Sequence, residues 1–98
     1  MFVGVSRIEL HIPASGSLKG KRTVVKGLIG GLTAKFNLAV AEVAHQELWQ
    51  RTALGVACVS GEIGHIRKMQ QEIERFVARE SRVEILDIDH EIFQPEDD

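Results

Sequence analysis

The sequence predicts an α+β fold made of four strands and two helices. Three observations carry this prediction: segments in which apolar residues alternate, segments in which they recur every three or four positions, and the order of these segments. A chain of 98 residues can bury one core without help from disulfides or metals. We therefore expect a single domain over residues 1–98, with a frayed acidic tail at 94–98.

The first half of the chain predicts a strand followed by a helix. Residues 2–12 alternate and place Ile8, Leu10 and Ile12 on one face, which is the period of a half-buried strand. Turn residues at 13–17 follow, and Ser17 is placed to cap a helix over residues 18–36. The core face of that helix is formed by residues spaced at about 100° per residue, namely Leu18, Val25, Leu28, Ile29, Leu32 and Phe36.

The second half predicts two strands, a helix and a last strand. Residues 37–45 and 52–60 both alternate, with a polar connection between them. After a turn at Ser60 and Gly61, which also offers a cap, apolar residues repeat with helical spacing from Ile63 to Val77. The last strand covers residues 82–93, and its apolar phase changes beside Ile85, which predicts a β-bulge there.

This order of elements is that of the ferredoxin-like βαββαβ sandwich. The predicted fold has a four-stranded antiparallel sheet of order 4-1-3-2, with both helices on one face. In that topology, the connections after the first strand, after the second strand and after the second helix emerge at the same end of the sheet. Residues 13–22, 45–51 and 79–82 should therefore be neighbours.

Composition limits the kinds of partner and compartment. A net charge of -2 and a pI near 6.1 argue against overall positive charge as the means of binding nucleic acid or membrane. The single cysteine, Cys58, lies in an apolar run and is expected to be a core residue in a reducing compartment. No long apolar stretch begins the chain, so we expect neither a signal peptide nor a membrane span, and a cytoplasmic protein.

The start of the first predicted helix is rich in groups that favour an anion. Ser15 and Ser17 supply hydroxyls beside the positive end of the helix dipole. Lys19, Lys21 and Arg22 follow, although cations at this end oppose the dipole. Either a phosphate or carboxylate compensates them, or they pair with Glu47 or with solvent.

Residues 42–51 form a second candidate binding segment. Trp49 offers a stacking face and Arg51 a planar set of donors, and both kinds of group bind unstacked bases or protein partners. Further donors and acceptors come from His45, Gln46 and Gln50. The alternative is that Trp49 closes the open end of the sandwich while Arg51 pairs with Glu42 or Glu47.

The same segment gives little support to catalysis or metal binding. His45 with Glu42 or Glu47 could act as a base and its orienting group, but no Ser, Thr or Cys nucleophile stands beside them in a known motif. The spacing of histidines and carboxylates matches no familiar metal site. The sequence therefore favours a protein that is not an enzyme, with no catalytic residue, metal or cofactor.

Three surfaces bear on partners. A stripe of small residues on the first helix, Gly20, Gly27, Gly31 and Ala34, would allow the close approach of a second backbone, from another subunit or a nucleic acid. The charged side of the second helix mixes signs and is typical of a solvated face. The sheet face without helices carries small residues that favour a homo-oligomer, namely Ala39, Ala41, Ala53, Gly55 and Ala57.

Several runs resemble the YlxP-like family of small bacterial proteins. These are residues 9–13, 17–22, 36–37, 41–51 and 54–57, of which the most specific reads AEVAHQELWQR at 41–51. The resemblance implies a ferredoxin-like fold and an unknown function, with members often encoded near translation and ribosome-maturation factors, and it brings no catalytic residues. The chain departs from the family pattern at Gly20, where an acidic residue is common, and at Ala44, where Asp or Gly is commoner.

Three hypotheses follow. The first is a binding module for RNA or a ribosomal particle, in which Lys19, Lys21, Arg22 and Arg51 meet phosphate while Trp49 and His45 stack or hydrogen-bond. The second is a small anionic-ligand-binding protein or enzyme that uses the same residues. The third is an oligomerisation module.

Overall fold

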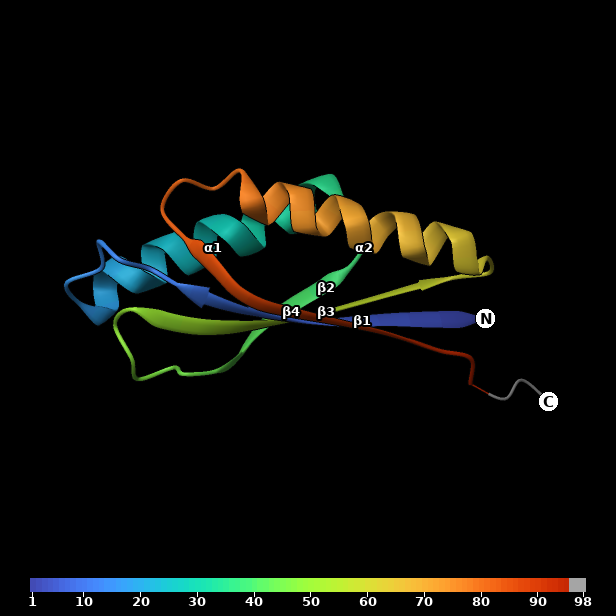
Figure 1. Cartoon of the computed structure of the whole chain (residues 1–98), viewed down its shortest axis with the longest axis horizontal. Coiled ribbons are helices and arrows are strands. Elements are labelled where there is room, and N and C mark those ends of the chain that lie inside the picture. The colour runs from blue at the N-terminus through green and yellow to red at the C-terminus, as the bar shows by residue number, and fades with distance from the viewer. Residues whose placement is uncertain (96–98) are drawn as a thin grey trace.

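The computed structural model describes residues 1–95 and contains a sheet covered on one face by helices (Figure 1). All six predicted elements are present, with bounds within about two residues of the predicted ones. The predicted frayed tail falls largely on residues 96–98, which lie outside the described residues. In chain order the elements are β1 (Phe2–His11), α1 (Leu18–Lys35), β2 (Ala39–Ala44), β3 (Arg51–Ser60), α2 (Ile63–Ala78) and β4 (Glu84–Phe93).

The predicted ferredoxin-like topology is confirmed. The four strands are antiparallel and lie in the order β2-β3-β1-β4, which is the predicted order taken from the other edge. Both helices lie above the sheet in the view of Figure 1, where α1 packs over β2 and α2 over β1, β3 and β4. The other face of the sheet carries no helix. Neither helix within residues 1–95 is both long and apolar enough to span a membrane.

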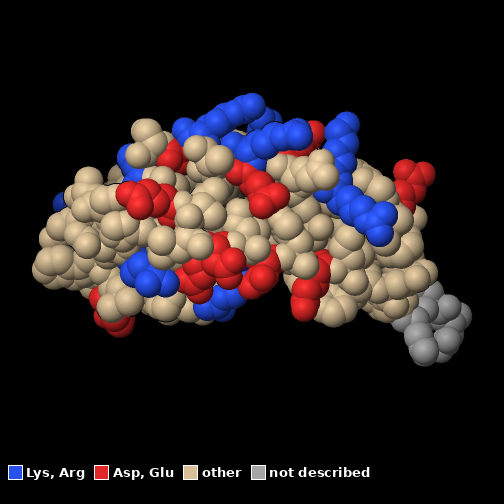
Figure 2. All heavy atoms as spheres, viewed as in Figure 1, with Lys and Arg blue, Asp and Glu red and all other residues tan. Residues whose placement is uncertain are grey.

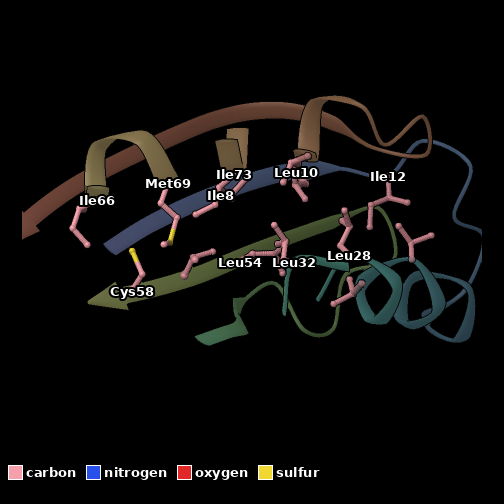
Figure 3. Packing of buried hydrophobic residues seen from close by; sticks show 14 residues of the cluster. Ile8, Leu10, Ile12, Leu28, Leu32, Leu54, Cys58, Ile66, Met69 and Ile73 are labelled. Carbon is pink, nitrogen blue, oxygen red and sulfur yellow. The ribbon is translucent and has the colours of Figure 1, made fainter. Parts of the chain in front are cut away.

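The core fills the space between the sheet and the helices. The alternation predicted for β1 is confirmed, because Ile8, Leu10 and Ile12 are all buried. Cys58 is a core residue, as expected, and burial raises the pKa of its thiol. The side chains shown in Figure 3 converge from both layers; the buried cluster comprises Ile8, Leu10, Ile12, Val24, Val25, Leu28, Leu32, Leu54, Val56, Cys58, Ile66, Met69, Ile73 and Val77.

Two bulges shape the outer strands. Leu10 pairs with Ile85 and Glu9 with Asp87, so Leu86 is an extra residue in β4. This is the bulge that the change of apolar phase predicts. A second shift in β2 leaves Val43 as the extra residue, and its side chain lies over Gly55, where an added Cβ would be 2.8 Å from Val43 Cγ1.

The small-residue stripe of α1 serves in part a contact within the chain. At Gly31 an added Cβ would lie 2.6 Å from Cζ of Phe76, so this glycine lets α2 approach α1 closely. Gly30 has no neighbour within 4 Å of such an atom. Only part of the stripe therefore remains for a second backbone.

Replacement of Gly4 by alanine should destabilise the fold, because α2 lies directly on β1 at this position. An added Cβ would meet Ile66 Cγ2 at 2.5 Å and Cys58 Sγ at 3.2 Å. We expect Gly4→Ala to lower the free energy of unfolding by about 1–3 kcal/mol, the usual cost of overpacking. Urea denaturation followed by circular dichroism measures this. Gly30→Ala is the matched control and should raise stability by up to about 1 kcal/mol; equal effects of the two substitutions would contradict this account.

Candidate functional site

Two of the three segments predicted to converge do so at one end of the sheet. The loop 45–50 between β2 and β3 lies against the loop that joins β1 to α1, since Ile12 N–H donates to Gln50 O at 2.9 Å. The side-chain amide of Gln50 donates to the carbonyl oxygens of Pro13 and Ser15, each at 3.3 Å. We call residues 13–22 and 45–51 together the rim.

The third segment, residues 79–82, lies elsewhere. The guanidinium of Arg82 pairs with the carboxylate of Glu80 at 2.8 Å. Its Nη2 atom would lie only 3.2 Å from a Cβ added at Gly27, in the middle of α1. No hydrogen bond or ion pair joins 79–82 to the rim within residues 1–95. The turn after α2 therefore lies along α1 instead of joining the loops.

Lys21 is the buried centre of the rim. Its side chain is 1% exposed, and Nζ donates to the backbone oxygens of His45 at 2.7 Å, Gln46 at 3.1 Å and Arg51 at 3.3 Å. Nζ also pairs with the carboxylate of Glu42 at 3.1 Å. The carboxylate partner is therefore Glu42, and neither Glu47 nor solvent, the two alternatives to a bound anion. The ammonium group is fully engaged inside the chain and is not available to a ligand.

The hydroxyl groups predicted to face an anion also have partners within the chain. Ser17 caps α1, as predicted, because its Oγ accepts the N–H of Gly20 at 3.0 Å. Ser15 is buried and its hydroxyl donates to the carbonyl oxygen of Ser17 at 3.1 Å. Thr52 donates to the Glu42 carboxylate at 2.6 Å and so completes the surroundings of Lys21. These contacts hold the rim in shape.

A second cluster lies on the helix-free face of the sheet, around Glu9 of β1. One carboxylate oxygen of Glu9 accepts from Arg7 at 2.8 Å. The other lies 3.1 Å from His45 Nε2 and 3.1 Å from Arg51 Nη2. The alternative pairing of Arg51 with Glu42 or Glu47 does not occur, because the register of β1 and β3 places Arg51 opposite His11, diagonally from Glu9 on the same face.

The geometry of this cluster fixes the ionisation of Glu9. Burial raises the pKa of the Glu9 carboxyl, but hydrogen bonds from Arg7, Arg51 and His45, with the charge of His45, outweigh it and hold the pKa below its ordinary value. His45 reaches Glu9 from a backbone of φ 64, a left-handed conformation that histidine tolerates better than most residues. Sequence reasoning missed Glu9; its available signal was its position two residues after Arg7 in an alternating strand.

The side chains of four other rim residues are exposed and make no hydrogen bond or ion pair within residues 1–95. Trp49 is 54% exposed, so it projects from the loop and does not close the sandwich. Lys19 and Arg22 are exposed and make no ion pair in this part of the chain. The side chain of Gln46 is likewise exposed, although its carbonyl group binds Lys21. These four side chains can be reached by a ligand, as can those of Glu47, Leu48 and Gln50, which are also exposed.

Basic side chains line the top of the helical layer on the face shown in Figure 2. Acidic side chains lie both beside them and lower, over the sheet. The sequence of α1 contains no acidic residue; its basic residues are Lys19, Lys21, Arg22, Lys26 and Lys35. Along β4, Asp87, Asp89 and Glu91 are all exposed. No group of three or more metal-ligating side chains occurs within residues 1–95.

Comparisons with known proteins give a family and a fold. The model of a family described as "Protein of unknown function (DUF503)" matches residues 3–90. The chain is 36% identical over 75 residues to "Uncharacterized protein YlxP" of Bacillus subtilis (strain 168), which covers 76% of this chain and 82% of that protein. A solved structure, "De novo designed protein Foldit4", is similar with a TM-score of 0.55 and 10% identity over 98% of this chain and all of its own. That likeness concerns the fold alone.

Removal of the Lys21 charge should destabilise the chain strongly. Lys21→Met leaves the Glu42 carboxylate without its cation and removes one donor from three backbone oxygens, of which that of His45 keeps the N–H of Leu48. We expect a loss of about 3–5 kcal/mol in the free energy of unfolding, as for other broken buried pairs. Denaturation followed by circular dichroism measures it. Lys19→Met, at an exposed position, should change stability by less than about 0.5 kcal/mol; a similarly small effect at Lys21 would refute the buried network.

Glu9 should make stability fall in acid. Its folded pKa lies below the ordinary value of a glutamate, so the unfolded chain binds the proton more readily. The stabilisation is fully present well above the unfolded pKa of Glu9 and is lost as the pH falls through the folded pKa. A carboxyl titration by NMR should place the Glu9 midpoint below that of an exposed glutamate. Arg51→Ala removes one donor and should move that midpoint upward, whereas Arg67→Ala on α2 should not; an unmoved midpoint in Arg51→Ala would contradict the assignment.

Proposed function

This chain belongs to the DUF503 family of proteins of unknown function, and we propose that it is a non-enzymatic module that binds RNA, either free or in a ribosomal particle. The proposal is supported chiefly by the exposed cations of α1. It rests on a surface that combines phosphate-binding cations with an exposed aromatic ring, which are the two kinds of group that single-stranded RNA requires.

The cations of α1 form one stripe. Lys19, Arg22 and Lys26 are spaced by three and four residues, so they share a side of the helix and span about 10 Å. All three are exposed and none has an ion pair within residues 1–95. Cations near the start of a helix oppose its dipole at a cost of some tenths of a kcal/mol each. A bound phosphate would relieve that cost.

Trp49 lies at the same end as this stripe. Lys21, in the first turns of α1, holds the carbonyl groups of His45 and Gln46 and thereby fixes the loop that carries Trp49. An unstacked base could rest on the exposed indole while the neighbouring phosphates meet Lys19 and Arg22. In this proposal Trp49, Lys19, Arg22 and Gln46 contact the RNA. The other predicted residues have a structural role, because they hold the loops in place: Lys21, Ser15, Ser17 and Gln50.

The helix-free face of the sheet is less suited to RNA. RNA-binding sheets of this topology stack bases on aromatic residues of the central strands. On this face β1 and β3 present Val5, Arg7, Gly55 and Ala57 instead. Arg7 and Arg51 are already paired with Glu9, and the acidic residues of β4 would repel phosphate. The support therefore favours α1 and the rim.

The two alternatives draw on different observations. A small anionic ligand at the rim would need Lys21 and His45, which are bound to Glu42 and Glu9. Self-association is favoured by an apolar hollow of about 370 Å³ on the helix-free face, lined in part by Val5, Ala41 and Val43. Light scattering at micromolar concentration tests it, and a monomer there would remove this alternative.

The salt dependence of RNA binding tests the proposal. We expect Arg22→Ala to weaken binding of a labelled RNA hairpin with a single-stranded loop, measured by fluorescence anisotropy. The slope of log K against log salt should become shallower by about 0.7–1, the contribution of one phosphate contact. Arg67→Ala is the matched control, because Arg67 is also exposed and without an ion pair within residues 1–95 but lies on α2. Equal losses in both variants would indicate unspecific charge and contradict the proposal.

Trp49→Ala provides the second arm of the same test. Loss of one stacked base should weaken binding by about 1–3 kcal/mol and leave the salt slope unchanged. Trp49→Phe should retain most of the affinity because it keeps an aromatic face. Full affinity in Trp49→Ala would exclude stacking at the rim.

A further inference from the structure

A groove runs between the C-terminal end of α1 and the flank of α2. It consists of two adjoining hollows that share Lys35 and Glu72. The larger has a volume of about 300 Å³, at the lower end of the range for ligand pockets, and its lining includes Phe36, Asn37 and Lys68. The smaller has a volume of about 180 Å³ and continues the groove toward Arg79.

The groove is electropositive. Lys68, Arg75 and Arg79 lie along one flank of α2, spaced by seven and four residues, and Lys35 faces them from α1. None of these four cations has an ion pair within residues 1–95. Glu72 is the one carboxylate in the lining of the two hollows. Although the sequence of α2 mixes positive and negative residues, most of the charged residues that line the groove are cations.

The groove also has an apolar wall with a polar group beside it. Phe36 and Phe76 meet edge to face, with centroids 6.2 Å apart, and Lys35 Nζ lies 5.6 Å and 5.8 Å from the two ring centroids. These contacts hold Lys35 at the groove while leaving its ammonium group free of any carboxylate. Met69 adds apolar surface to the larger hollow, and the Asn37 amide adds donors and an acceptor.

We propose that this groove binds a nucleoside phosphate unit, supplied by a free nucleotide or by one residue of an RNA strand. The phosphate lies between Lys35 and Lys68, and the base lies against Phe36 and Met69 with its edge toward Asn37. Arg75 and Arg79 attract a further phosphate in the smaller hollow. Lys35 is sixteen residues from Lys19 along α1, about 24 Å by the helix rise. The groove is therefore separate from the rim and from the exposed cations near the start of α1.

The full chain, labelled with ¹⁵N, is titrated with adenosine 5′-monophosphate, with orthophosphate and with a short single-stranded RNA. Adenosine 5′-monophosphate should shift the side-chain amide of Asn37 and the backbone amides of Phe36, Lys68 and Met69. Lys68→Ala should weaken its binding by about tenfold, the effect of one charge-assisted hydrogen bond. Lys68→Arg should keep binding, and Arg67→Ala, the neighbouring cation outside the groove, should leave it unchanged.

The outcomes separate the possibilities. Tighter binding of the RNA than of the mononucleotide at these residues supports the site and makes an RNA strand the source, whereas equal binding supports it with a free nucleotide as the source. Equal shifts with orthophosphate and adenosine 5′-monophosphate would overturn the proposal, because the base would then contribute nothing. Absence of shifts at millimolar ligand would also overturn it. The two proposals can fail separately. If substitution of Arg22 and Trp49 leaves RNA binding unchanged but the mononucleotide still binds in the groove, only the proposed function of the rim is refuted.

Discussion

The burial of one ammonium group determines the shape of the rim. A charge removed from water costs several kcal/mol unless its surroundings replace the lost hydration. Lys21 meets this requirement with oxygen atoms from four residues on β2, the following loop and the first residue of β3. The carbonyl groups must therefore point inward, which accounts for the left-handed backbone at His45 and fixes the loop against the start of α1. The positions of Trp49 and Arg22 relative to each other depend on this contact.

The same contact divides the polar residues of the rim into two sets. Side chains that bind backbone groups of the loops, such as Ser15 and the NH2 group of Gln50, stabilise the loops. Side chains on the outside, such as Lys19 and Trp49, contribute little to stability and are open to a partner. Polar composition alone does not separate these sets. Most polar side chains of such a segment can serve to stabilise the fold, while a few exposed ones remain accessible to a ligand.

Sequence periodicity predicted the fold closely, including the bulge at Leu86, because burial on one face imposes a period on every element. It did not predict the role of Lys21, although the signal was present: Lys21 stands four residues before Val25 and seven before Leu28, on the core side of α1. Because the prediction grouped Lys21 with Lys19 and Arg22 by charge, it overlooked that Lys21 lies on the core side of the helix. The partner of Arg51 depends on the register of β1 and β3, and the inter-helix groove depends on how α1 and α2 pack. Neither follows from local pattern.

Trp49 is the one tryptophan in a chain without tyrosine, and it lies outside the core. Its intrinsic emission therefore reports the polarity around one loop of the molecule. An optical signal from this indole will respond to changes in its own surroundings. The chain thus carries a built-in spectroscopic probe in the loop between β2 and β3.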